Sequence, residues 1–455
     1  MAQPAAERTG PLQGTIVGRD TAGNQLTVAH GDVPGVMMAM TMAYEVRGQR
    51  VAALPKNGTH ITATLHEADG AFWLTDVQAG GHEMPMASDI LMRQASGTAM
   101  NPAAAPMHMT MTQTGDWILM LHGAAFVSQV VQSGPRGDDK LFSTNWIMGM
   151  AERPLAGGHL MLRSMLSLEP LTVGKKYPEL FQTGETTGGR PIVDAQHPHD
   201  FFMELAAEYA HEIANGTTVY VYAAPVGDPA LGPVAYPHRA SAPEIPQATL
   251  SHHVQDSTHI AGSVLTIGAQ SAALGYAFSG FHGRESDENR WDIDSGKIDS
   301  WAARVTYDPT PNWSAQISTG HLRHPEDAEP GNVQRTTASV SYSDARWNTS
   351  LIFGHNKKTE GHSASSWVAE SVLQFGGGNY VTGRGEIVDK DELIAGDVFR
   401  IKALTLGYSR DLLATPAITG ALGANATVYS IPDALKADYG SNPRALYLFV
   451  RLRGH

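Results

Sequence analysis

Apolar and polar residues alternate over most of the chain from residue 116 to the C-terminus. In the stretch SWAARVTYD, Trp301, Val305 and Tyr307 share one face of the segment, and Arg304 lies on the other. A period of two residues is typical of a strand with one buried face. Sixteen candidate strands can be placed, near residues 116–132, 141–153, 158–168, 201–213, 217–224, 258–269, 272–283, 298–308, 312–323, 335–344, 347–355, 366–375, 378–388, 400–411, 417–429 and 444–453.

The connections between these candidate strands alternate between long loops and tight turns. The turns include ANG at 214–216 and PTP at 309–311, and Asn-Gly is a strong signal for a tight hairpin. Outer-membrane barrels have this rhythm, with short turns in the periplasm and longer loops outside. The pattern therefore predicts an all-β fold, in which residues 116–455 form an antiparallel up-and-down transmembrane β-barrel of about 16 strands.

Two alternatives to this interpretation stay open. A soluble β-sandwich would explain the alternation, although it would not explain the regular change between long and short connections. The segment FFMELAAEYAHEI at 201–213 consists of good helix formers, so a helix competes with a strand there.

The N-terminal part of the chain shows a different, shorter-stranded pattern. In HITATLHEADGAFWLTDVQ, two alternating runs flank a turn around Gly70. About five short strands within residues 10–83 predict a small closed barrel of the OB kind, preceded by a flexible N-terminus at 1–9. Residues 84–115 lack an amphipathic period and are rich in Ala, Pro, Ser, Thr and Gly, which predicts a Met-rich linker.

Composition narrows the classes of function. The formal net charge of -13 argues against a nucleic-acid partner. The chain has no cysteine, which excludes disulfides, thiolate metal sites and a blue-copper centre. No run approaches the ~18 apolar residues of a membrane helix. The first residues, MAQPAAERTG, have no apolar stretch of the signal-peptide type, so the protein is either cytoplasmic or a mature form with the signal removed and a Met added. The barrel pattern favours the second interpretation.

Methionine is distributed unevenly. All 18 methionines lie at or before Met203, and eleven of them fall between Met37 and Met111. Thioether sulfur and imidazole nitrogen suit the soft ions Cu(I) and Ag(I). In HGDVPGVMMAMTM, Met40 and Met42 leave the same face of a strand, and a sulfur of Met37 and a nitrogen of His30 could complete a site. Met38 is a further candidate ligand, and a core strand that happens to be rich in methionine is the alternative.

The stretch HGDVPGVMMAMTMAYEV resembles the periplasmic Cu(I)/Ag(I)-binding proteins of the CusF type. The resemblance covers about 70 residues and rests on MTM preceded by a Pro-containing loop and a histidine. It implies a five-stranded barrel with Met40, Met42 and His30 as ligands. Family members carry a tryptophan that covers the metal, but Met37 stands near that position here and suggests a third sulfur instead. Such proteins hand metal to an efflux system, so the resemblance implies metal loading.

The rest of the chain looks more loosely like outer-membrane β-barrel proteins found in copper-resistance settings. The stretches that carry this likeness are GPRGD, SLEPLTVG, LFQTGET, DAQHPHD and ALTLGYSRDL. The general plan, a Met-rich N-terminal segment before a barrel, is similar as well. This likeness identifies no ligands.

Further candidate ligands lie in the linker and in two loops. The linker contains Met107, His108, Met109 and Met111, which indicate either a plain tether or one that also binds soft metal ions. The loop histidines could converge on Cu(II) or Zn(II), or they could be solvated. They are His197, His199, His252 and His253.

Soft side chains also recur on the expected lumen face of the first strands. They are Met120, His122, Met148, Met150, His159, Met161 and Met165. They could line a path for metal. Alternatively, these side chains and Arg163 on the same face could fill the barrel, together with a network of arginine and glutamate side chains that includes Glu204, Arg304, Arg384 and Glu386.

The first functional hypothesis is binding and handling of copper or silver, by sequestration or transport, at the outer membrane of a Gram-negative bacterium. The N-terminal domain would lie in the periplasm. Expected partners are metal ions, outer-membrane lipid and lipopolysaccharide, and periplasmic efflux or copper-oxidase components. No catalytic motif is present, so an enzyme is not expected. A copper-dependent oxidase with loop histidines as its centre is one alternative, and a structural outer-membrane protein with a metal-scavenging domain is the other.

Overall fold

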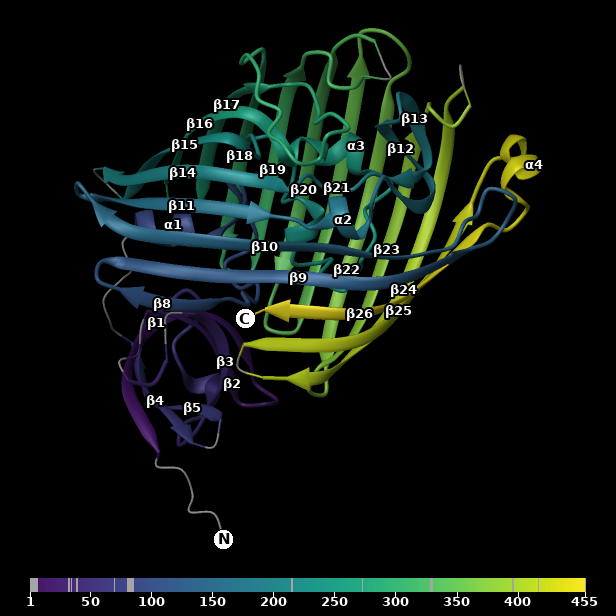
Figure 1. Cartoon of the computed structure of the whole chain (residues 1–455). Helices are drawn as coiled ribbons and strands as arrows, with labels where there is room; N and C mark the ends of the chain where they lie inside the picture. The colour runs from purple at the N-terminus through teal and green to yellow at the C-terminus, as the bar shows by residue number, and fades with distance from the viewer. Residues whose placement is uncertain are drawn as a thin grey trace.

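The computed structural model describes residues 7–31, 33, 35–37, 40–68, 70–79, 86–213, 216–271, 273–327, 330–394, 397–415 and 417–454. Within them the chain forms two closed β-barrels, a small N-terminal one and a large one that follows it in the sequence and lies above it in the view of Figure 1. The candidate ligand Met38 and residues 1–6 of the expected flexible N-terminus lie outside the described residues.

The small barrel consists of five strands in the order β1-β2-β3-β5-β4 and closes where β1 pairs with β4. All pairings are antiparallel except the one between β3 and β5. Apolar side chains from every strand point inward, including Leu12, Val28, Tyr44, Leu65 and Leu74. The five-stranded prediction is confirmed. The strands are β1 (Arg8–Asp20), β2 (Gln25–His30), β3 (Met40–Val46), β4 (His60–Ala68) and β5 (Ala71–Ala79), with the 3-10 turn η1 (Val51–Ala53) before β4.

The large barrel has sixteen antiparallel strands and closes where β26 pairs with β9. Each of the sixteen predicted strands is present. They are β9 (Trp117–Gln132), β10 (Lys140–Leu155), β11 (Gly158–Leu166), β14 (Phe202–Ile213), β15 (Thr217–Gly227), β16 (Ala261–Ser271), β17 (Leu274–His282), β18 (Ser300–Thr310), β19 (Trp313–Leu322), β20 (Val333–Ser343), β21 (Trp347–Lys358), β22 (Ala364–Phe375), β23 (Asn379–Lys390), β24 (Phe399–Ala414), β25 (Ile418–Ser430) and β26 (Arg444–Gly454).

The helix alternative for residues 201–213 is wrong. The segment forms β14, whose Glu208 carboxylate lies 2.6 Å from the guanidinium of Arg163 on the neighbouring strand β11. Both side chains are buried inside the barrel. A strand aims alternate residues at the lumen, so it places this carboxylate beside its partner, and tertiary pairing overrides the local helix propensity.

Residues 86–115 are not an extended tether, which corrects the prediction of a linker. They form α1 (Met86–Arg93), β6 (Gln94–Ser96), β7 (Ala99–Met100) and β8 (Thr110–Thr114). Helix α1 packs against β11, β14 and β15, and β8 pairs with β9. Ala87, Leu91, Met109 and Met111 are buried there, because the lumen wall offers them an apolar surface that sequence periodicity does not reveal.

Two long connections fold back into the large barrel. The first joins β11 to β14 and contains α2 (Glu169–Thr172), β12 (Tyr177–Thr187) and β13 (Arg190–Gln196). The second, residues 228–260, contains η2 (Tyr236–His238), α3 (His252–Gln255) and η3 (Ser257–Ile260), and most of its side chains are buried. We call residues 228–260 the lumen segment. A later connection carries η4 (Asp433–Leu435) and α4 (Lys436–Tyr439).

The small barrel lies at the turn end of the large one, where β26 ends at Gly454 (Figure 1). Arg346, in the tight turn between β20 and β21, forms an ion pair with Asp20 at the end of β1. The two barrels therefore meet at the mouth formed by the tight turns.

The outer face of the large barrel is apolar. Leucine, valine and isoleucine side chains are exposed along the strands, and exposed aromatic side chains gather toward the tight turns, including Tyr276, Tyr307, Trp313, Trp347 and Tyr408. An outward apolar band with aromatic residues at its rim is the surface of a membrane barrel. Among the described residues, none of the helices is long and apolar enough to cross a membrane.

Substitution of an outward leucine by arginine tests this surface. Leu406 is 59% exposed on the outer face of β24, midway between Lys402 and Arg410. We expect Leu406→Arg to lower the free energy of unfolding from phospholipid vesicles by ~2–4 kcal/mol, because the cation lies in the hydrocarbon. Leu412→Arg, nearer the tight turn, should cost only about 0–1 kcal/mol. Equal costs at both positions in denaturant unfolding would contradict a membrane-facing β24.

Candidate metal sites

In the small barrel, His30 and Met37 are held together by one hydroxyl group. The Tyr44 hydroxyl donates to Sδ of Met37 at 3.0 Å and also forms a hydrogen bond with Nε2 of His30. His30 Nδ1 lies 2.7 Å from the carbonyl oxygen of Gly31. Burial raises the pKa of Tyr44, so its phenol stays protonated. The hydroxyl therefore lies between a nitrogen and a sulfur that a soft ion could take as ligands.

Met40 and Met42 approach the same place from β3. His30 and Met40 are direct partners in the register of β2 and β3, and Met42 follows two residues later. Cross-strand partners have Cβ atoms about 4.5–5.5 Å apart, and residues i and i+2 share a face. Met37 and Met42 both pack against the core of the small barrel. The structure thus gathers His30, Met37, Met40 and Met42 in one region.

Trp73 does not belong to this group. Its indole stacks on the imidazole of His66 with ring centroids 5.3 Å apart, and the guanidinium of Arg47 lies 4.0 Å from its ring centroid. The aromatic ring in contact with His30 is that of Tyr44, at a centroid distance of 5.5 Å. The interpretation that Met37 stands where relatives have a tryptophan stays a prediction.

The large barrel contains a cluster of ten methionines, which we call the lumen methionine cluster. It brings together side chains from α1, β8, β9, β10, β11 and β14 and from the segment before β8. Its members are Met92, Met107, Met109, Met111, Met120, Met148, Met150, Met161, Met165 and Met203. The predicted lumen-facing methionines therefore do face the lumen, and Met107, Met109 and Met111 of the expected linker join them. His108 is exposed at the rim of the adjoining cavity.

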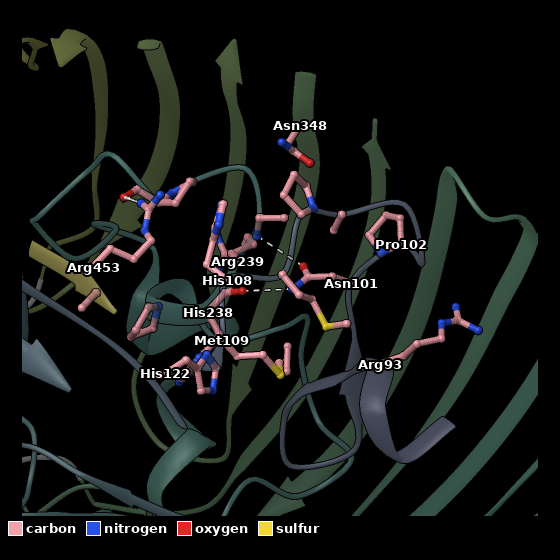
Figure 2. Close-up of a pocket in the computed structure, with 18 of the residues that line it drawn as sticks. Arg93, Asn101, Pro102, His108, Met109, His122, His238, Arg239, Asn348 and Arg453 are labelled. Carbon is pink, nitrogen blue, oxygen red and sulfur yellow. Dashed lines mark hydrogen bonds between the residues drawn. The ribbon is translucent and has the colours of Figure 1, made fainter. Parts of the chain in front are cut away.

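A cavity of about 180 Å³ adjoins this cluster at the turn end of the barrel (Figure 2). His122, His238, His108 and Met109 line one part of it, and Arg453 and Asn348 line another. Asn101 holds the lumen segment in place here, because its side-chain amide donates to the carbonyl oxygen of His238 at 3.0 Å.

A second group forms from two loops, in which His197, His252 and His253 converge. One ligand nitrogen from each lies within 4.8 Å of the others, and all three side chains are buried. Burial lowers the pKa values of His197 and His252. Burial also disfavours the charged form of His253, but Glu285 and Glu326 outweigh it and raise the pKa of that imidazole.

Carboxylates complete this group. His253 Nδ1 lies 3.6 Å from Glu285 and 3.5 Å from Glu326, and His197 Nε2 lies 3.1 Å from Glu185. Among the described residues, neither ring nitrogen of His253 and neither carboxylate oxygen of Glu285 has a hydrogen-bond partner, although both side chains are buried. Unsatisfied buried polar atoms are costly, and a metal ion bound between them would satisfy them.

The space around this group is limited. A cavity of about 20 Å³ lies against His197, His252 and Glu285, which is room for roughly one water molecule or ion. Gly184 on β12 has a φ of 117°, and a Cβ there would overlap the imidazole of His253. The position therefore favours glycine for two reasons: its φ is positive, and the His253 imidazole occupies the space that a Cβ would need.

His199 lines the same small cavity but is not one of the three converging histidines. Its Nδ1 lies 3.0 Å from Glu169, and its Nε2 lies 3.2 Å from the hydroxyl of Tyr236. Both ring nitrogens are thus engaged by protein partners. We assign His199 a structural role in holding α2 against the lumen segment.

Several residues of these sites carried no sequence signal. His238 lies in an irregular segment rich in proline and alanine, and Glu185, Glu285 and Glu326 come from three separate connections. Only the folding of these connections into one lumen brings them together. These residues are buried, but hydrophobic periodicity predicts burial only in helices and strands, so the sequence of a loop does not reveal it.

Comparison with known proteins assigns the small barrel to a family. Residues 9–79 match the family of copper binding periplasmic protein CusF. The matched range coincides with strands β1 to β5, so the CusF-type domain is the small barrel itself. A comparison of the whole chain with curated protein sequences finds no significant match.

The large barrel is similar in fold to solved porins. The anion-selective porin from Comamonas acidovorans has a TM-score of 0.50 and 12% sequence identity, with 74% of this chain and 99% of that chain covered. Salmonella typhi OmpF, in a complex with daunomycin, has a TM-score of 0.49 and 11% identity, covering 75% and 100%. The first likeness supports the barrel fold and says nothing of cargo.

Proposed function

We propose that this protein binds and handles Cu(I) or Ag(I) at the outer membrane of a Gram-negative bacterium, as part of resistance to these metals. The observation that carries the proposal is the CusF-type domain at the mouth of a membrane-type barrel. The CusF-type domain would hold the ion through His30, Met37, Met40 and Met42. Thioethers and a neutral imidazole give up no proton on binding, so such a site suits a soft monovalent ion without cysteine.

The orientation follows from the turns. In barrels of this type the short turns face the periplasm, so the CusF-type domain would lie there and take up metal from periplasmic carriers. Efflux or copper-oxidase components are the expected partners on that side. On the other side, the charged loop that contains Asp287, Asp292 and Asp294 would face lipopolysaccharide.

Titration of the full-length protein in detergent with Cu(I), against a competing chelator, tests this proposal. The wild-type protein should bind Cu(I) tightly, and removal of the Met40 and Met42 sulfurs should lower its affinity for one equivalent of Cu(I). Recovery of the protein with the outer-membrane fraction is the second requirement. Weak binding that is equal in wild type and variant would leave a barrel of unknown cargo.

We further propose that the His197, His252 and His253 group holds a divalent first-row ion. Imidazoles with nearby carboxylates suit Cu(II) or Zn(II) better than soft monovalent ions, and Cu(II) leads the affinity order for such ligands. The supporting observation is that both ring nitrogens of His253 are buried and have no hydrogen-bond partner in the part of the chain that the structure describes. This group also supports the alternative function, a copper-dependent oxidase that uses dioxygen as its oxidant.

Electron paramagnetic resonance of Cu(II) added to the full-length protein tests this second site. We expect a nitrogen-coordinated Cu(II) signal, and His197→Ala or His253→Ala should weaken binding at least 10-fold, since removal of even an outer partner of a metal ligand costs that much. His362→Ala, in an exposed loop, is the matched control. An unchanged spectrum in both cluster variants would refute the site. Dioxygen consumption that disappears in the same variants would favour the oxidase.

A further inference from the structure

The lumen methionine cluster stands out against the rest of the barrel interior. Elsewhere the lumen is filled by charged side chains, and Arg335, Arg384 and Arg451 are among the largest fully buried ones. Membrane barrels of this type generally have polar interiors. Ten thioethers gathered on one part of the wall therefore require an explanation beyond the fold.

Strand register aligns ligand-type side chains in one row across the wall. His122 on β9 is the direct partner of Met148 on β10, and Met148 is the direct partner of Met165 on β11. Met148 and Met165 are buried on the lumen side. Direct partners have Cβ atoms about 4.5–5.5 Å apart, so the row presents one imidazole and two thioethers side by side.

The lumen segment adds a second imidazole to this row. His238 Nε2 lies 3.1 Å from Sδ of Met165. The His238 and His122 rings are 6.4 Å apart between centroids, and the indole of Trp146 packs against both. Nε2 of His122 is buried without a hydrogen-bond partner among the described residues.

We infer that His122, Met148, Met165 and His238 form a second binding site for the same soft monovalent ion, Cu(I) or Ag(I). Two thioether sulfurs and two imidazole nitrogens are a donor set that such ions prefer, and hard cations do not. This inference rests on the proposed function, because the CusF-type domain defines the cargo. It adds a second binding site for that ion inside the large barrel.

The position of this site favours transfer from the small barrel. The cavity beside the cluster is lined by His122 and His238 at one side and by Arg346 at another, and Arg346 is paired with Asp20 of the CusF-type domain. Met107 and Met109 line the same cavity. An ion leaving the CusF-type domain would therefore meet further thioethers on its way to the row.

Space filling is the competing explanation, since methionine adapts to irregular gaps. Leucine fills nearly the same volume without sulfur, and exchange between the two is usually tolerated in cores. Met148→Leu/Met165→Leu therefore removes the ligands and keeps the packing. His238→Gln is an independent variant that removes one imidazole. Met100→Leu is the matched control, because Met100 lies on β7 outside the cluster.

The experiment is an equilibrium titration of the full-length protein in detergent with Ag(I), with X-ray absorption of the bound silver as the second readout. Wild type should bind two equivalents. Met40→Leu/Met42→Leu, which disables the CusF-type site, should retain one, and its silver should show sulfur neighbours. In that background, Met148→Leu/Met165→Leu or His238→Gln should weaken the retained equivalent at least 10-fold, whereas Met100→Leu should not.

The outcomes separate the two proposals. If Met40→Leu/Met42→Leu binds no silver, the lumen site is refuted while the proposed function stands. If the retained silver is insensitive to both lumen variants, or shows only nitrogen and oxygen neighbours, the inference is overturned as well. Wild-type protein that binds no silver at all would instead refute the proposed function.

Discussion

Replacement of Met40 and Met42 together by leucine should lower the affinity of the full-length protein for one equivalent of Cu(I) by about 100-fold or more. This corresponds to roughly 2.7 kcal/mol of binding free energy. Loss of an outer partner of a metal ligand costs about 10- to 100-fold, and this variant removes two direct ligands. Leucine keeps the volume of both side chains, so that the barrel core around Met42 stays packed. Competition with a Cu(I) chelator measures the change.

The geometry explains why the effect should be large. The β2–β3 register fixes Met40 opposite His30, so the sulfur and the nitrogen are aligned before the ion arrives. To bind, the ion must replace the Tyr44 hydroxyl that now engages His30 and Met37. Without Met40 and Met42, only these two ligands remain, and both already have a hydrogen-bond partner.

Met100→Leu serves as the control for this variant too, since it removes a thioether from the large barrel. It should leave both the number of bound ions and their affinities unchanged. If Met40→Leu/Met42→Leu bound Cu(I) as tightly as wild type, the four residues would be only a methionine-rich strand and its neighbours. The metal would then have to be sought in the large barrel.

The barrel fold could be predicted from the sequence because its determinants are local. Alternation marks each strand, and the rhythm of turns and loops marks the connectivity. For β14, which consists of good helix formers, local residues leave helix and strand open, because Glu204 and Glu208 are four residues apart and share a face in either structure. Residues 86–115 escaped prediction, because α1 is short and its apolar residues are buried by strands far along the chain.

The candidate sites differ in the same respect, because one depends on local strand geometry and the other on the tertiary fold. His30, Met37, Met40 and Met42 lie within thirteen residues, and strand geometry alone brings them together. The lumen row needs strand pairing for His122, Met148 and Met165, and it needs the fold of the lumen segment for His238. No periodic pattern predicts where an irregular loop will place one histidine.

Arg239→Ala should loosen the lumen segment. The buried guanidinium of Arg239 lies 3.0 Å from Glu370 on the wall strand β22, pairs with Asp256, and donates to the carbonyl oxygen of Val234 at 3.0 Å. Removal of one partner from a buried ion pair typically costs about 3–5 kcal/mol, because the carboxylates stay buried without it. We expect the local opening of residues 228–260 to become about 100-fold or more frequent.

Hydrogen–deuterium exchange of the full-length protein in detergent measures this opening, since amides of the lumen segment exchange when it leaves its hydrogen bonds. Arg400→Ala is the control, because Arg400 pairs with Asp389 on the exposed face of the barrel, where such pairs contribute little to stability.

Single-channel conductance in planar bilayers gives the functional consequence of a loosened lumen segment. The lumen segment lies inside the barrel and carries His238 and His252, so its loosening should let more ions pass through the barrel and weaken metal binding. Unchanged exchange in Arg239→Ala would mean that Arg335 and Arg384 on the barrel wall suffice to hold the segment through their bonds to its carbonyl oxygens.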